Sequence, residues 1–315
     1  MAKKKKAATG RKKAKQRTFG SQLLRISAGA VFLITVIAAV ILAALVLLPK
    51  SNSPKQTTHR IARPQPDRPV FEVYPDEPTP VKKPCKPGEK AGKPRVAIII
   101  DDVGYDKKIA NQFLAMEIPL TFSVLPHSPL NKTIVQAAYS KNIEIMLHLP
   151  MEPLEYPRIN PGPGVLLTSM APDELIRQLE ENLADVPHVK GVNNHMGSKM
   201  TTISTQMYQI FSVLKKHDLF FIDSRTAAGT LCKPSARLLH VPFAERDVFL
   251  DNSLSSDYID HQLDILVDIA CRNGTAIGIG HPHAATCRRI KQNLARMKQK
   301  VTFVPASSLV DEIGS

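Results

Sequence analysis

The feature that most constrains this 315-residue chain is an apolar run, residues 96–100, that leads directly into Asp101 and Asp102. A continuous apolar run of this length is typical of a strand that is buried on both faces of a parallel sheet. Such strands present ligand-binding and catalytic groups at their carboxyl ends. Two adjacent carboxylates there repel each other unless a cation or a proton lies between them. The pair therefore predicts a metal-assisted site.

The chain after residue 94 repeats the order of strand and helix. Apolar segments that predict strands lie at 119–125, 143–149, 189–192, 219–222 and 275–279, and amphipathic segments alternate with them. This order predicts an α/β fold, an irregular (β/α) barrel of roughly seven parallel strands, with an open doubly wound sheet as the alternative. The motifs of dinucleotide-binding proteins and P-loop NTPases, GxGxxG and GxxxxGK[ST], are missing.

Two local expectations concern helix and strand boundaries. Ser128 is expected to be the N-cap of a helix over 129–140, with Pro129 at its first position. A short strand is also expected around residues 239–241.

The basic charge of the chain lies before the predicted domain. The formal net charge is +14, and residues 1–93 hold 20 Lys/Arg against 5 Asp/Glu, which leaves 22 against 23 for residues 94–315. A domain that is nearly neutral gives no support to a nucleic-acid partner.

Three segments precede that domain. Residues 1–25 carry ten Lys/Arg and no acid, residues 26–48 carry no charge, and residues 49–93 are rich in proline. A helix over 26–48 is long enough to cross a bilayer core of about 30 Å, and a basic flank stays cytoplasmic. We therefore expect a cytoplasmic tail, a single-pass inner-membrane anchor, an extended linker and a periplasmic domain at 94–315. A cleaved signal peptide is the alternative to the anchor.

Polar side chains gather at or just after the ends of the predicted strands. They are Asp101, Asp102, His148, Glu152, His195, Asp223, Asp251 and His281. In a β/α barrel these strand ends share one face, so the side chains are expected to converge. Histidine and aspartate suit zinc or a similar divalent ion, which in catalytic sites keeps three protein ligands and one open position. Such a site can hydrolyse an amide or ester with a carboxylate as general base and a histidine as general acid.

The four cysteines, Cys85, Cys232, Cys271 and Cys287, show no CxxC spacing. A thiolate zinc site is therefore not expected. A disulfide between Cys271 and Cys287 and free buried thiols remain alternatives.

Five motifs resemble those of the divergent branch of the polysaccharide deacetylase (NodB-homology) superfamily. They are IIIDDVG at 98–104, MLHLPMEP at 146–153, NNHMGS at 193–198, FIDSRT at 221–226 and IGHPH at 279–283. The resemblance implies an irregular (β/α) barrel and metal-dependent removal of acetyl groups from N-acetylated sugars.

The resemblance also implies roles for individual residues. Asp101 corresponds to the general base, Asp102 to the metal-binding aspartate and His148 to the first metal-binding histidine. His281 corresponds to the histidine that protonates the leaving amine.

The chain departs from the family pattern at two places. The usual second metal histidine lies four residues after the first, where this chain has Glu152, and an arginine-containing motif is replaced by one that contains His195. We therefore expect Asp102, His148 and His195 to hold a divalent metal, zinc foremost, with Glu152 as the rival ligand. The side chains expected to position substrate or to support the ligands from behind are Glu152, Asp223, Arg225 and Asp251.

The function expected from these residues is deacetylation of an N-acetylated glycan of the cell envelope. A glycan-binding or scaffold domain on the same fold, in which the metal site has decayed, is the alternative. A metallophosphoesterase is a third hypothesis, and it predicts more metal-bridging carboxylates than this sequence offers.

Overall fold

The computed structural model describes residues 92–312, all within the unit of the chain that follows residue 63. The expected basic tail and anchor, and the linker as far as residue 91, lie outside the described residues. Within 92–312, every helix is too short or too polar for a membrane span.

The described residues contain one curled sheet of ten strands. They are β1 (Arg95–Val103), β2 (Thr121–Val124), β3 (Glu144–Met151), β4 (Gly191–Met196), β5 (Phe220–Asp223), β6 (Pro242–Glu245), β7 (Val248–Phe249), β8 (Thr275–Gly280), β9 (Thr302–Phe303) and β10 (Asp311–Glu312). Their order is β10-β6-β5-β4-β3-β2-β1-β8-β7, with β9 beside β1. All neighbours are parallel except β10 and β6.

The predicted α/β class and parallel sheet are confirmed, but the sheet is a curled half-barrel and not a closed one. The edge strands β10 and β7 do not pair with each other in the described part of the chain. Each is two residues long, so neither offers enough backbone hydrogen bonds to complete a ring.

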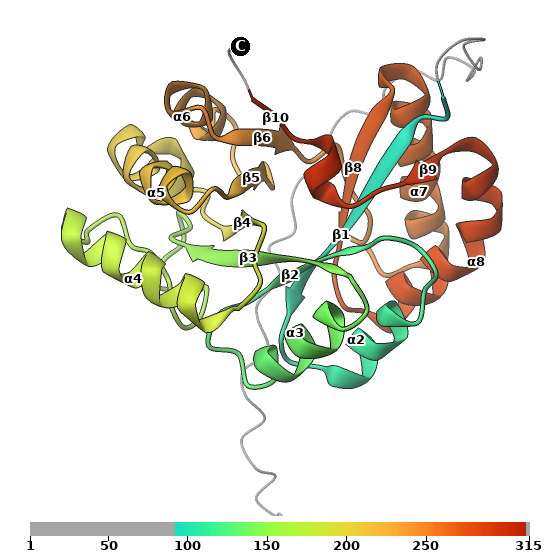
Figure 1. Ribbon diagram of the computed structural model, residues 1–315, viewed down its shortest axis with the longest axis horizontal. Helices are drawn as coiled ribbons and strands as arrows, with labels where there is room; N and C mark the ends of the chain where they lie inside the picture. The colour runs from blue at the N-terminus through green and yellow to red at the C-terminus, as the bar shows by residue number, and fades with distance from the viewer. Residues whose placement is uncertain (1–91, 313–315) are drawn as a thin grey trace, which may run out of the picture. The chain divides into compact units, whose positions relative to one another are not determined.

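Helices surround the outer side of the sheet (Figure 1). They are α2 (Lys107–Leu114), α3 (Asn131–Tyr139), α4 (Pro172–Asp185), α5 (Ser204–Lys216), α6 (Cys232–Leu239), α7 (Ser256–Asn273) and α8 (Ala284–Lys300). The short 3-10 helices η1 (Met200–Thr202) and η2 (Ala306–Leu309) lie in connecting segments.

Two local predictions were wrong. Helix α3 begins at Asn131, and Ser128 does not cap it, because the Ser128 hydroxyl donates to the Leu125 carbonyl at 2.7 Å and closes the preceding turn. The predicted strand at 239–241 overlaps the end of α6, an unpredicted helix. It ends in the left-handed His240, where the Val241 N–H donates to the Ala236 carbonyl.

Alternate strand residues face two different cores. On β1, Ile98 packs in the large core beneath the helices, whereas Ile99 packs in a smaller core on the inner side of the sheet. Each such side chain contributes about 1.5–3 kcal/mol when fully buried. This alternation decides which residues at a strand end face the inner side.

The C-terminal segment closes one end of the inner core. Ala306 and Leu309 of η2 pack there, and the Ala306 N–H donates to Thr121 Oγ1 at 3.0 Å. Since Thr121 begins β2, this segment covers the amino ends of the strands. The carboxyl ends are left to form the site.

Candidate metal centre

The carboxyl end of β1 places two neighbouring carboxylates on one side of the sheet. Adjacent residues of a regular strand point to opposite faces, so Asp101 would follow Ile99 inward and Asp102 would face the helices. The register with β2 shifts between Ile100 and Val103, and Asp102 has a φ of 54°. This irregularity acts as a β-bulge that re-aims a side chain, in a backbone region that aspartate tolerates. Both carboxylates therefore face inward.

Asp102 meets two histidines from other strands. Asp102 Oδ1 lies 3.1 Å from His148 Nε2 and 3.0 Å from His195 Nδ1, and the two nitrogens are 3.1 Å apart. All three side chains are buried. No described residue makes a hydrogen bond of regular geometry to either Asp102 oxygen or to His195 Nε2. The sequence prediction that these three side chains converge is confirmed.

These donors fit a divalent metal ion. Ligands placed about 2.0–2.1 Å from a tetrahedral zinc stand roughly 3.3–3.4 Å from one another, and the three distances above lie within about 0.4 Å of that spacing. The pocket that they line measures about 20 Å³, room for one ion or one water. One carboxylate with two imidazoles is a donor set that zinc and related transition metals accept. The described residues contain one group of this kind, Asp102 with His148 and His195.

The charges of the cluster shift the pKa values of the two carboxyl groups in opposite directions. Burial would raise the pKa of Asp102, but the adjacent His195 and His148 hold it well below its usual range. For Asp101, burial outweighs the opposing effects of His148 and His281, and the pKa is raised. Asp102 therefore remains an anionic ligand, whereas Asp101 is the carboxylate better suited to accept a proton.

The inward carboxylate Asp101 lies beside this group and contacts an amide that the sequence reasoning missed. Asp101 Oδ2 is 3.7 Å from His148 Nε2, and both Asp101 oxygens accept from Asn193 Nδ2, at 2.8 and 3.0 Å. Asn193 could have been found from its position. It lies two residues before His195 on the same face of β4, and it is the register partner of His148.

His281, the residue after β8, lines the same pocket and is held by Asp251. His281 Nδ1 is 2.8 Å from Asp251 Oδ1, and the His281 backbone N–H donates to Asp251 Oδ2 at 2.7 Å. Thr286 Oγ1 also donates to that oxygen at 2.6 Å. Burial alone would lower the pKa of His281, but the charge and hydrogen bond of Asp251 raise it to about 9. His281 is therefore protonated at neutral pH.

A comparison with protein families decides where this arrangement belongs. A family model described as divergent polysaccharide deacetylase matches residues 98–310, most of the described chain. The chain belongs to this family. The resemblance drawn from the five motifs is thereby confirmed.

Individual relatives match a similar length of the chain. Uncharacterized protein YibQ of Escherichia coli (strain K12) is 38% identical over 222 residues, which cover 70% of this chain and 68% of the relative. An uncharacterized protein of Haemophilus influenzae (strain ATCC 51907 / DSM 11121 / KW20 / Rd) is 30% identical over 215 residues, 68% of this chain and 76% of that protein. The crystal structure of uncharacterized protein ATU2773 from Agrobacterium tumefaciens C58 is similar with a TM-score of 0.66 and 27% identity. It covers 72% of this chain and 93% of its own.

Glu152, the position of the family's second metal histidine, is not part of the metal-binding group. Its Oε1 accepts from Lys199 Nζ at 2.6 Å and its Oε2 accepts from the Thr168 N–H at 2.5 Å. Burial would raise the pKa of Glu152, but these two contacts lower it. The carboxylate joins the loop after β3 to the loop after β4, so its place is that of a loop anchor.

Asp223 and Arg225 are not brought into the site either. On β5, Ile222 packs in the inner core, so Asp223 points to the helix side, as Phe221 does. Its oxygens accept from the Arg225 N–H at 2.8 Å and from Thr230 Oγ1 at 2.5 Å, and the Arg225 side chain is exposed. Ser224, the residue after Asp223, lines the pocket at the ligand group, whereas Asp223 does not. The expected substrate-positioning role of Asp223 and Arg225 is therefore not supported by their placement.

The cysteines lie apart from this chemistry. Cys271 is disulfide-bonded, whereas Cys232 and Cys287 are free and buried. The considered pairing of Cys271 with Cys287 was therefore wrong.

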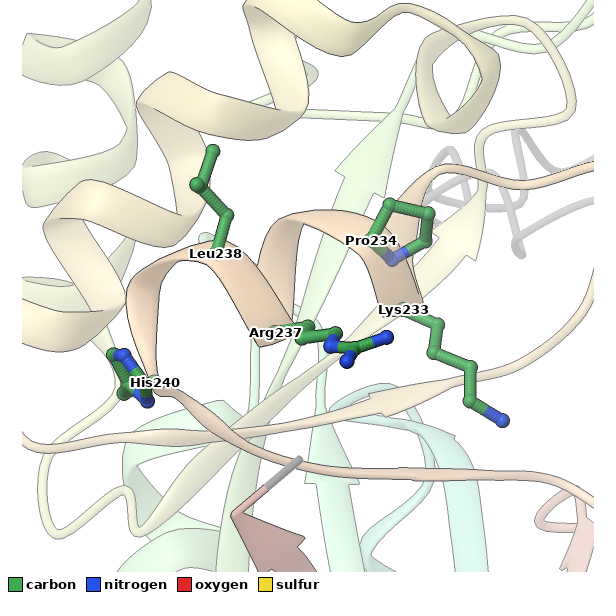
Figure 2. A pocket seen from close by; sticks show the side chains of 5 residues that line it. All are labelled: Lys233, Pro234, Arg237, Leu238 and His240. Atoms are coloured by element: carbon green, nitrogen blue, oxygen red, sulfur yellow. The ribbon is translucent and has the colours of Figure 1, made fainter. Parts of the chain in front are cut away.

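A second hollow lies on the surface of α6 (Figure 2). The described residues that line it are Lys233, Pro234, Arg237, Leu238 and His240. This lining offers no carboxylate and a single imidazole, so it does not provide a set of metal ligands. The candidate site is the cluster at the strand ends.

Proposed function

We propose that this protein is a metal-dependent carbohydrate N-deacetylase that acts on an N-acetylated polysaccharide of the cell envelope. The observation that carries the proposal is the buried group of Asp102, His148 and His195, whose ligand atoms lie within 3.1 Å of one another. Membership of the divergent polysaccharide deacetylase family supports the substrate class.

Asp102, His148 and His195 would hold the ion, zinc foremost. A divalent ion supplies a Lewis acid for the carbonyl of the acetamide and makes a nearby water more acidic. Burial of the three ligands excludes bulk water and strengthens the electrostatic interactions of the site.

Two further side chains would move the protons of the hydrolysis. Asp101 would accept a proton from the attacking water, because its pKa is raised by burial and it lies next to the ligand group. His281 would donate a proton to the leaving amine nitrogen, because Asp251 keeps it protonated at neutral pH. The amide bond then breaks with the water oxygen on the acetyl carbon and the proton on the amine.

We further propose that the reaction takes place outside the cytoplasm, with the chain held in the inner membrane by residues 26–48. The supporting observations are the uncharged run with its basic flank and the disulfide at Cys271, a bond that persists in oxidising compartments.

The test is metal analysis of the purified full chain, followed by acetate release from chitooligosaccharides and peptidoglycan. One zinc per chain with acetate release supports the proposal. Glycan binding without metal or acetate would favour the glycan-binding or scaffold alternative. Hydrolysis of phosphate esters without acetate release would favour a metallophosphoesterase.

A further inference from the structure

Asn193 contacts both the base and a ligand of the proposed site. We propose that Asn193 is the positioning residue of this centre, in which one amide orients the His148 ring toward the metal and also holds the Asp101 carboxylate. The inference rests on the proposed function. It assigns a role to a residue outside the metal ligands and the proton-transfer pair.

The oxygen end of the amide orients His148. Asn193 Oδ1 lies 2.8 Å from His148 Nδ1 and also accepts from Ser123 Oγ at 2.5 Å. A carbonyl oxygen accepts only, so Nδ1 carries a proton, and Nε2, which faces Asp102 and His195, is the ring nitrogen left for a metal. This is the ring state that a metal-binding histidine requires, with its other nitrogen donating to a fixed partner.

The nitrogen end of the amide holds Asp101. The two hydrogens of Nδ2 can reach two acceptors, and both Asp101 oxygens lie within 3.0 Å. The reverse orientation would place the amide oxygen against the Asp101 carboxylate, so that acceptors would face each other. The contact with Asp101 therefore selects a single orientation of the amide. A neutral amide fixes the direction of Asp101 without adding a positive charge beside it.

The surroundings prevent the amide from turning. Asn193 is fully buried, and its backbone is in register with His148 on β3 and with Ile222 on β5. Ser224 Oγ lies 3.4 Å from Nδ2. Contacts from β1, β2, β3 and the residue after β5 thus meet at one side chain of β4, which makes the geometry pre-formed.

Two substitutions separate the two ends of the amide. Asn193→Ala removes both, and zinc affinity should fall by about 10- to 100-fold. Asn193→Asp keeps an oxygen for the His148 ring proton but replaces the donor to Asp101 with a second carboxylate oxygen. Zinc affinity should then stay within about threefold of wild type. Acetate release should fall at least tenfold, because the Asp101 carboxylate loses the donor that orients it as the general base.

The control is Asn182→Ala. Asn182 is equally buried and donates to the Gly164 carbonyl at 2.7 Å, and it neither lines the pocket at the ligands nor belongs to the ligand group. Its removal tests the general effect of losing a buried amide, and zinc affinity should not change.

Zinc affinity is measured by competition with a chromophoric chelator, and the His148 ring state by ¹⁵N NMR of the metal-free protein. In the wild type the hydrogen bond to Asn193 should protect the Nδ1 proton of His148 from exchange with water, and Asn193→Ala should remove that protection. Unchanged zinc affinity together with an unchanged ring state would overturn the inference.

The outcomes also separate this inference from the proposed function. If the wild-type chain binds zinc but releases no acetate, the proposed function fails. The zinc affinities of the variants still test whether Asn193 orients His148. If it binds no zinc, the NMR measurement still judges the orientation of His148. If Asn193→Ala fails to fold, the near-isosteric Asn193→Asp is tested alone. A loss of zinc affinity equal to its loss of activity would contradict the separate roles proposed for the two ends of the amide.

Discussion

Asp102 and Glu152 are two buried carboxylates at the ends of strands of one sheet, yet their surroundings differ. Each is 5% exposed or less. Both oxygens of Glu152 accept hydrogen bonds, from Lys199 and from the Thr168 N–H. Both oxygens of Asp102 lack a regular hydrogen bond from any described residue, and Oδ1 faces the nitrogens of His148 and His195.

The difference identifies which carboxylate is structural and which is available for a cation. An ionised carboxylate in a buried site costs several kcal/mol unless donors or a positive charge compensate it. Lys199 and Thr168 supply that compensation for Glu152. For Asp102 the protein supplies imidazoles, which can also be metal ligands, so this carboxylate is the one available for a cation.

The largest effect is expected for Asp102→Asn. The loss of the anionic ligand should reduce zinc from about one per chain to below a tenth, and acetate release should fall by about 10³-fold. Mass spectrometry of the metal and an acetate assay measure both. Asp218→Asn is the matched control, because Asp218 has a similar φ of 55° but is exposed. Full zinc content in Asp102→Asn would remove the distinction between the two carboxylates.

His195→Ala tests the rival assignment of the third ligand. Zinc affinity should fall by at least about 100-fold, because two ligands bind a divalent ion much more weakly than three. His261→Ala, an exposed histidine of α7, serves as control. Unchanged zinc content in His195→Ala would show that His195 is not a ligand.

Asp251→Asn should change the pH dependence of the reaction. In the wild-type chain the pKa of His281 is about 9, so acetate release should decline as pH rises through that value. Without the carboxylate the pKa moves toward its ordinary value of about 6.5, and the decline moves to lower pH with it. At pH 8 the variant should be at least about tenfold slower, and at pH 6 close to wild type. Asp264→Asn, a partly exposed position on α7, should keep the wild-type profile.

Glu152→Gln should give the smallest effect. Zinc content should be unchanged, and the free energy of unfolding should fall by about 1–2 kcal/mol, because the charge-assisted bond to Lys199 is lost. Since the pKa of Glu152 is lowered in the folded chain, this contribution is present at neutral pH. It is lost as pH falls through that lowered pKa, so the two chains should converge in acid. Denaturant unfolding at pH 7 and pH 3 measures the difference. A loss of zinc in Glu152→Gln would show that Glu152 is a metal ligand.

Much of the centre followed from local sequence patterns. The apolar run of β1, the parallel order of strands and helices, and the polar residues at strand ends placed Asp101, Asp102, His148, His195 and His281 together. These inferences depend on hydrophobic periodicity and on a general property of parallel sheets, and both are visible in a single chain.

The sequence by itself determined the α/β class and the strand ends that carry the chemistry. Only the tertiary structure decided which side chains face inward. The bulge after Ile100 turns Asp102 toward the histidines. Asp223 follows the inward-facing Ile222 by one residue and therefore points to the helix side. The register of β3 and β4 brings Asn193 against His148. The physical reason is that side-chain direction alternates along a strand, so its sign depends on bulges and on pairing with distant segments. The choice between Glu152 and His195 as the third ligand also needed the tertiary structure, which shows that Glu152 already accepts hydrogen bonds from Lys199 and Thr168.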